Sequence, residues 1–256
     1  MLSQSDYEAS ELFLDHTKAP RPDKVHIGLV QLSTDHSIER DLNMLVGSSA
    51  MVFSNRVYYS SAMTKEALAE ISRGITQSAE LIATGLPMDV MAFGCTSASI
   101  VIGNEKIREL LTANTPGIPA TNPWAGALAA FKHLKARRVS IFSPYPTEVN
   151  YPLYRQLAAE GLEVPTIGAL RIEKDTDITT VSFDSMLEGA RRILAQAPTD
   201  ALFMSCTNLR ALEHIEEIEA EVGVPIVTST QAMFWHAMTL VGKQPGIEGF
   251  GQLLKG

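Results

Sequence analysis

The two cysteines of this 256-residue chain lie in two copies of one short motif, DVMAFGCTS at 89–97 and DALFMSCTN at 200–208. Each copy has an acid, four apolar residues, a small residue, Cys, Thr and a small polar residue. Two thiols on opposite sides of a small substrate suit one kind of chemistry well. One thiol removes a proton from one face, or adds to it, and the other delivers a proton to the opposite face. We therefore predict that Cys95 and Cys206 are the catalytic residues.

A cysteine after an apolar run also has a simpler interpretation, because Cys is often a small buried hydrophobic residue. A residue needed only to fill space has no reason to recur at the same point of a repeated unit. The matched contexts of Cys95 and Cys206 therefore favour the functional interpretation.

The residues around each cysteine predict its structural setting. Four apolar residues between polar ones indicate a strand buried on both faces, and the polar residues that follow indicate a turn into a helix. Each thiol would lie at the carboxyl end of a parallel strand, where open α/β sheets bind ligands. A helix amino terminus there should lower the thiol pKa and offer N–H groups to a carboxylate. We expect four neighbouring side chains to bind substrate, although simple helix capping is an alternative: Thr96, Ser97, Thr207 and Asn208.

The duplication extends beyond the cysteine motifs. The predicted strand Val25–Leu32 has a counterpart in Arg138–Ser143, and GIPAT at 117–121 is echoed by GVPIV at 223–227. We predict helices over Ser97–Leu111 and Leu209–Val222, each directly after its cysteine motif. The repeat predicts an α/β fold of two pseudo-symmetric, doubly wound lobes, whose four-stranded parallel sheets face a central cleft.

The predicted domains are an amino-terminal extension at 1–21, lobe one at 22–123 plus 230–256, and lobe two at 124–229. The extension is polar and acidic apart from Leu12, Phe13 and Leu14. We expect these three residues to dock on the body or on a second subunit.

Composition narrows the classes of partner. A net charge of −8 argues against nucleic acid and anionic membranes, and no apolar run is long enough for a transmembrane helix. The six histidines form no HExxH motif, so no metal is expected, and two cysteines do not make a disulfide scaffold. We expect a cytoplasmic homodimer or homotetramer that acts on a small carboxylate without a cofactor.

Four segments together resemble the aspartate/glutamate racemase superfamily: IGLV at 27–30, GCTSAS at 94–99, SPYPTEVN at 143–150 and SCTNLR at 205–210. The resemblance spans about residues 24–245. Within the superfamily, the chain looks most like the maleate cis–trans isomerase branch and the related EutA proteins of ectoine breakdown.

The resemblance implies a nucleophile or base at Cys95, an acid or base at Cys206, and a carboxylate-binding Tyr145. Where the family usually has Ser-Ser-Asn-Thr-Thr, this chain has STDHS at 33–37, so Asp35 replaces the carboxylate-binding Asn. Asp175 stands near the place of a second binding Asn.

An ionised Asp35 would repel a dicarboxylate and favour a substrate with one carboxylate and a cationic or amide arm. A diamino acid or its acetyl derivative fits that description. Asp35 also suits a capping or turn role, Tyr145 suits the packed ring of a rigid turn, and His36 suits a solvated loop.

The main hypothesis is therefore a cofactor-independent racemase or isomerase. An arylmalonate-type decarboxylase is an alternative, although that type is expected to resemble only the second half, with a single cysteine. A non-catalytic small-molecule-binding protein and a thiol redox switch also remain, and the absence of a CxxC motif makes the switch a poor fit.

Overall fold

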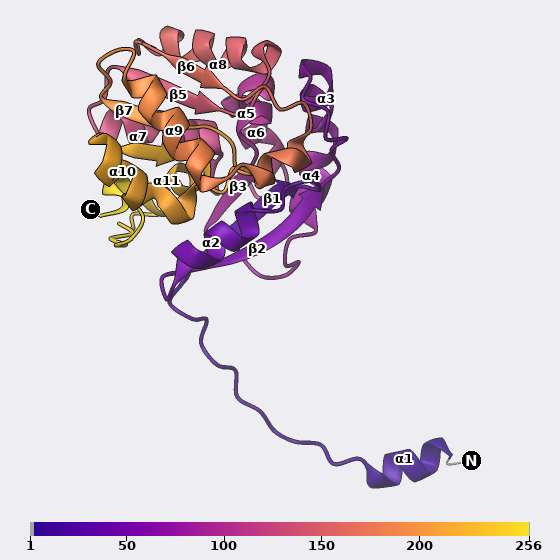
Figure 1. Ribbon diagram of the computed structural model, residues 1–256. Coiled ribbons are helices and arrows are strands. Elements are labelled where there is room, and N and C mark those ends of the chain that lie inside the picture. Colours follow the sequence, from indigo (N-terminus) through magenta and orange to yellow (C-terminus); the bar gives the residue numbers. More distant parts are fainter. Residues whose placement is uncertain (1–2, 256) are drawn as a thin grey trace.

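The computed structural model describes residues 3–255, whose body contains two four-stranded parallel sheets (Figure 1). Sheet one has the order β2-β1-β3-β4 and sheet two the order β6-β5-β7-β8. The strands are β1 Val25–Leu32, β2 Ala50–Val57, β3 Val90–Gly94, β4 Ala120–Thr121, β5 Val139–Ser143, β6 Ile167–Ala169, β7 Ala201–Met204 and β8 Ile226–Thr228. The second order repeats the first, so the predicted α/β fold of two related lobes is confirmed.

Helices cover both sheets, and three short 3-10 helices join them. The α-helices are α1 Gln4–Ser10, α2 Ile38–Val46, α3 Lys65–Glu70, α4 Ser72–Glu80, α5 Thr96–Ile102, α6 Asn104–Leu111, α7 Pro123–His133, α8 Thr147–Ala159, α9 Phe183–Leu194, α10 Ile215–Val222 and α11 Ser229–Leu240. The 3-10 helices are η1 Asp175–Thr180, η2 Leu212–His214 and η3 Gln252–Leu254. No helix within residues 3–255 is long and apolar enough to cross a bilayer.

The predicted helix Ser97–Leu111 is interrupted. Gly103 has φ +93° and separates α5 from α6. Only glycine adopts this backbone conformation readily, so the chain bends there at little cost. The prediction of one continuous helix is wrong at this position.

Two helices connect the lobes. α7 packs closely against α11, and Gly126 makes the approach possible, because a Cβ there would lie 2.5 Å from the Ala232 carbonyl oxygen. Phe131 of α7 packs edge-on against Phe203 of β7, with ring centroids 5.6 Å apart. In turn, α11 contacts β3 and α2 of the first half. The exact lobe boundaries stay a prediction.

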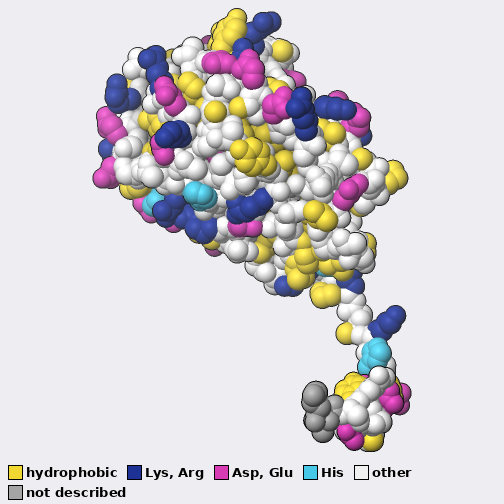
Figure 2. Space-filling view, turned by 90° about the vertical axis from the view of Figure 1, so that its right-hand side faces the viewer, with side chains coloured by type: hydrophobic (Ala, Val, Ile, Leu, Met, Phe, Trp, Pro, Cys, Tyr) yellow, Lys and Arg dark blue, Asp and Glu magenta, His cyan; other side chains and the backbone are white. Residues whose placement is uncertain are grey.

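The amino-terminal extension stands away from the body (Figures 1 and 2). From residue 3 to residue 23 every side chain is exposed, and α1 buries none of its residues. Leu12, Phe13 and Leu14 therefore do not dock on the body of their own chain, which was one of the two places predicted for them. Residues 1 and 2 of the predicted extension lie outside the described residues.

Candidate active site

Cys95 lies at the carboxyl end of β3 and is the N-cap of α5. Its Sγ accepts a hydrogen bond from the Ala98 N–H at 3.4 Å and lies 3.5 Å from the Ser97 hydroxyl. The predicted strand, turn and helix are all present here. The first thiol is thus positioned by a helix amino terminus, as the motif indicates.

Cys206 lies at the carboxyl end of β7, but the predicted helix Leu209–Val222 does not start beside it. A turn follows, and the helical structure begins only at Leu212. Cys206 has φ +135°, a strained conformation for a residue with a side chain. Its N–H donates to the Ser229 hydroxyl at 2.9 Å, and its Sγ accepts from the Asn208 N–H at 3.4 Å. This thiol is therefore positioned by contacts with the start of α11, and not by a helix that begins directly after the strand.

Both thiols are buried, with Cys95 5% exposed and Cys206 6% exposed. Burial raises the pKa of Cys95 to about 12, and the nearby charge of Asp175 adds to the effect. Burial and the charge of Asp175 also raise the pKa of Cys206, and an ionised Cys95 raises it further. Because the charge of Cys95 affects Cys206 and the charge of Asp175 affects both, the thiols share one electrostatic neighbourhood. The expectation of lowered thiol pKa values is wrong for this structure, because desolvation outweighs the helix terminus.

The threonines after the two cysteines bond to residues far away in the sequence. The Thr96 hydroxyl donates to the Ser229 hydroxyl at 2.8 Å, so Ser229 connects the first motif to the Cys206 N–H. The Thr207 hydroxyl donates to Asp35 Oδ2 at 2.7 Å. These bonds fix the two motifs relative to each other. Substrate contacts by Thr96, Ser97 and Thr207 stay predictions.

Asp35 is buried and caps α2. Its Oδ1 accepts from the N–H groups of Ser37 at 2.9 Å and Ile38 at 2.8 Å. Burial raises the pKa of Asp35, and the hydrogen bonds from Ile38, Thr207 and Ser37 oppose that rise. The capping alternative considered for this residue is therefore present in the structure. A role for Asp35 in selecting substrate stays a prediction.

Asn208 and Asp175 join the two lobes on the same side of the site. Asn208 Nδ2 donates to the Asp175 carbonyl at 2.9 Å, and its Oδ1 accepts from the N–H of the exposed His36 at 3.0 Å. Asp175 Oδ2 accepts from the Thr34 hydroxyl at 2.6 Å. Burial raises the pKa of Asp175 to about 7. Asp175 therefore changes charge near neutral pH beside two thiols.

Tyr145 is buried next to Cys206. Its hydroxyl oxygen accepts from the Ser205 hydroxyl at 3.5 Å, and its carbonyl accepts from Asn150 Nδ2 at 2.8 Å. Burial first, and then the charges of Cys206 and Cys95, raise the pKa of Tyr145. The ring is packed, which agrees with the interpretation of Tyr145 as part of a rigid turn. Its hydroxyl also lies close enough to the two thiols for their charges to raise its pKa.

Sequence reasoning missed Tyr59. This residue is buried, and its hydroxyl donates to the Ala62 carbonyl at 2.7 Å. Its pKa is raised by burial and by the charges of Cys95, Asp175 and Cys206. The adjacent Tyr58 is 80% exposed. The sequence could therefore indicate only that one of two neighbouring tyrosines is buried, and not which of them lies near the thiols.

Loops from both lobes meet beside Asp175. Ala62 and Lys174 form an antiparallel bridge, and the Asp175 N–H donates to the Ser61 carbonyl at 3.1 Å. This contact joins the segment after β2 to the segment before η1. Within residues 3–255, no group of three or more His, Cys, Asp or Glu side chains is placed to hold a metal ion.

Residues 51–254 match the family model described as arylmalonate decarboxylase. The chain belongs to the arylmalonate decarboxylase family. The match includes both cysteine motifs, so the expectation that this type resembles only the second half is wrong.

Individual relatives fall into two activities. The arylmalonate decarboxylase of Bordetella bronchiseptica is 33% identical over 130 residues, which cover 49% of this chain and 53%, about half, of that enzyme. A maleate isomerase of Pseudomonas putida is 24% identical over 244 residues, covering 90% of this chain and 97% of the relative.

Solved structures of the same two kinds share the fold. The maleate cis–trans isomerase of Nocardia farcinica, solved with a covalently bound succinylcysteine intermediate, has a TM-score of 0.82 at 22% identity and covers 90% of this chain and 98% of its own. A liganded arylmalonate decarboxylase mutant has a TM-score of 0.79 at 24% identity, with coverages of 90% and 98%.

Proposed function

We propose that this protein is a cofactor-independent isomerase or racemase of a small carboxylic acid, with Cys95 and Cys206 as its catalytic residues. The observation that carries the proposal is the placement of both thiols at the ends of corresponding strands, β3 and β7, in one buried neighbourhood. The similarity to maleate isomerases supports the same reaction class.

Two reactions are compatible with an active site that contains two thiols. In racemisation, one thiolate removes the α proton and the other thiol protonates the opposite face of the resulting enolate. In cis–trans isomerisation, a thiolate adds to one carbon of a carbon–carbon double bond. The former double bond is then a single bond and can rotate, and the double bond forms again when the thiolate leaves. Each route needs one thiolate and one carboxylate that accepts developing charge.

Asp175 would control how easily the thiolate forms. Its negative charge raises the pKa of both thiols, and its own pKa is about 7. A thiolate therefore forms more readily while Asp175 is protonated. The rise in rate with pH should therefore level off as Asp175 loses its proton near pH 7, because the added negative charge opposes further ionisation of the thiols.

The charges around the site favour a particular substrate. Asp35 and Asp175 both lie beside the thiols, so a dicarboxylate would meet negative charge there whenever either carboxyl is ionised, as Asp175 is above about pH 7. We favour a substrate with one carboxylate and a cationic or amide arm, such as a diamino acid or its acetyl derivative. Ectoine breakdown, with which the similar EutA proteins are associated, is a pathway that contains such compounds.

Decarboxylation of an arylmalonate-type substrate is the second candidate. The family match and the 33% identity to an arylmalonate decarboxylase favour it. A protein that binds a small carboxylate without reacting with it is the third.

Proton exchange in heavy water separates these candidates. An isomerase or racemase incorporates solvent deuterium at the α carbon or rotates a double bond without loss of carbon dioxide, whereas a decarboxylase releases carbon dioxide. Amino acids, their acetyl derivatives, maleate and arylmalonates would be screened by NMR. No reaction with any of them, despite binding, would favour the third candidate.

The cysteine variants test the mechanism. We expect Cys95→Ala and Cys206→Ala each to abolish turnover while the urea unfolding midpoint stays near that of the wild type. In a racemase, a single Cys→Ser change should leave proton exchange at one face without net racemisation. Full turnover in either alanine variant would exclude the two-thiol mechanism.

A further inference from the structure

The amino-terminal extension carries an apolar cluster that its own body leaves uncovered. Leu12 is 78% exposed, Phe13 86% and Leu14 78%. Three consecutive large apolar residues so exposed are costly in water, and such a group usually marks a contact with another surface. From residue 3 to residue 23 the chain is exposed throughout, and the extension runs away from the sheets (Figure 1).

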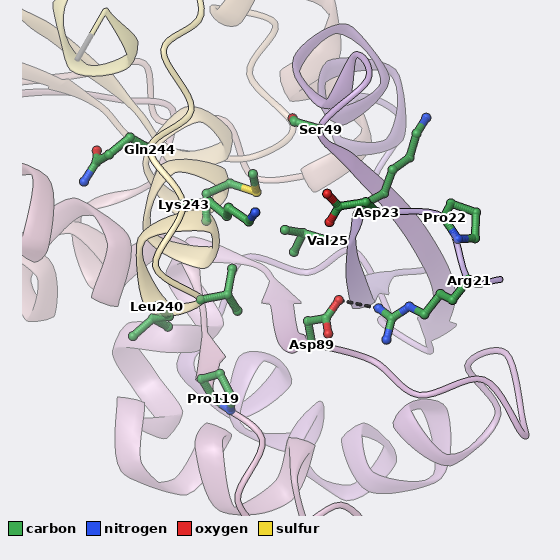
Figure 3. A pocket seen from close by; sticks show the side chains of 13 residues that line it. Arg21, Pro22, Asp23, Val25, Ser49, Asp89, Pro119, Leu240, Lys243 and Gln244 are labelled. Carbon is green, nitrogen blue, oxygen red and sulfur yellow. Dashed lines mark hydrogen bonds and ion pairs between the residues drawn. The ribbon is translucent and has the colours of Figure 1, made fainter.

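A large cavity lies where the extension leaves the body, at the end of sheet one opposite the thiols. Its volume is about 740 Å³. Figure 3 shows the side chains that line it. Apolar side chains from three separate segments line it, namely Val25, Pro119, Leu240 and Val241. Figure 2 shows hydrophobic side chains on the body near this junction. The cavity is large enough for more than one apolar side chain.

Charges at the cavity complement those of the extension. Lys24 and Lys243 line it, and neither forms an ion pair with another of residues 3–255. Arg21 is paired with Asp89, and Asp23 is the remaining acid of the lining. On the extension, the apolar cluster lies between two carboxylates, Glu11 and Asp15.

The chain between cluster and cavity directs the extension outward. Pro20 and Pro22 restrict the backbone on either side of Arg21 to extended conformations, and the Arg21–Asp89 ion pair anchors that point to the body. The seven residues that follow Leu14, up to Arg21, span about 23 Å when extended. In the structure the extension runs away from the body and its apolar cluster is exposed, so the cluster does not occupy the cavity at its own base (Figure 1).

We propose that Leu12–Leu14 of one chain dock in this cavity of a second copy, and that two chains exchange their extensions. Such an exchange is self-complementary, since each copy offers one cluster and one cavity, and so closes as a two-fold dimer. The apolar residues fill the lining around Leu240, while Glu11 and Asp15 face Lys24 and Lys243. The proposal is independent of the reaction at the thiols.

Sedimentation velocity of the full-length protein over a range of concentrations tests the proposal. We expect the wild type to be a dimer. The variant carrying Leu12→Ser, Phe13→Ser and Leu14→Ser should dissociate with a constant raised on the order of 100-fold or more, because it lacks all three apolar anchors. Leu81→Ser removes an exposed leucine elsewhere, on the surface beside α4, and should leave the dimer intact.

Charge reversal distinguishes exchange between chains from folding back within one chain. Glu11→Lys with Asp15→Lys, and separately Lys24→Glu with Lys243→Glu, should each weaken the dimer. An equal mixture of the two double variants should restore it, because both contacts of the mixed dimer then pair opposite charges.

Three results would overturn the proposal. They are a wild-type monomer, a dimer unaffected by the triple serine variant, and a mixture no more dimeric than its components. A monomer whose extension is protected from proteolysis would show instead that the cluster folds onto its own cavity.

Discussion

Replacing Asp175 with Asn should make the protein more stable above neutral pH. Asp175 is 5% exposed, and burial raises its pKa from 3.8 to about 7. The folded state therefore holds a proton that the unfolded state releases between these two pH values. The contribution of this proton to the free energy of unfolding is fully present below pH 3.8 and is lost as the pH rises to about 7.

The size of the effect follows from the pKa change. Each pKa unit corresponds to about 1.4 kcal/mol, so the wild type should lose up to about 4 kcal/mol relative to the variant across this range. Asn cannot ionise, and its Oδ1 can still accept the hydrogen bond from the Thr34 hydroxyl. The variant should therefore lack this part of the pH dependence while keeping the local structure.

Urea unfolding at a series of pH values from about 4 to 8 measures the effect. The free energy of unfolding of the wild type should fall relative to that of Asp175→Asn as the pH rises, and the difference should level off above about pH 7. Asp177→Asn is the matched control, because Asp177 lies in the same 3-10 helix but is exposed. Parallel curves for wild type and Asp175→Asn would refute the reasoning that this carboxyl is protonated by burial.

Two further changes test the substrate argument and the packing between lobes. Asp35→Asn retains the cap of α2 through Oδ1 but removes a buried charge, so calorimetry should show maleate-like dicarboxylates binding more tightly by about 1–3 kcal/mol and a diamino acid binding less tightly. If affinities for both classes are unchanged, Asp35 is only a capping residue. Gly126→Ala places a Cβ 2.5 Å from the Ala232 carbonyl oxygen and should destabilise the fold by about 1–3 kcal/mol in urea unfolding. An unchanged midpoint would mean that α7 and α11 can separate without cost.

Much of the fold follows from local patterns in the sequence. The apolar run at 25–32 is β1 within the predicted bounds, and the duplicated motifs end β3 and β7 as expected. Thr64 caps α3 through its side chain, which accepts a hydrogen bond from the Ala67 N–H three residues later. These features depend on neighbours a few residues away, so a single sequence contains enough information to predict them.

The arrangement of the candidate site depends on partners that no local pattern specifies. Thr96 bonds to a residue 133 positions away, and Thr207 to one 172 positions away. Asp175 and Tyr59 join the thiols only because loops from the two lobes meet at the Ala62–Lys174 bridge. The residue types and their spacing in the sequence identify which side chains could react. Their hydrogen-bond partners depend on which distant segments the fold brings together.

The thiol pKa values illustrate the same division. The motif predicts a cysteine at a helix amino terminus, which is correct for Cys95 and wrong for Cys206. The helix terminus would lower the thiol pKa, whereas burial desolvates both thiols and raises their pKa values. Sequence determined that two cysteines end two equivalent strands. Only the tertiary structure determined how deeply they are buried, because burial depends on the packing of both lobes together.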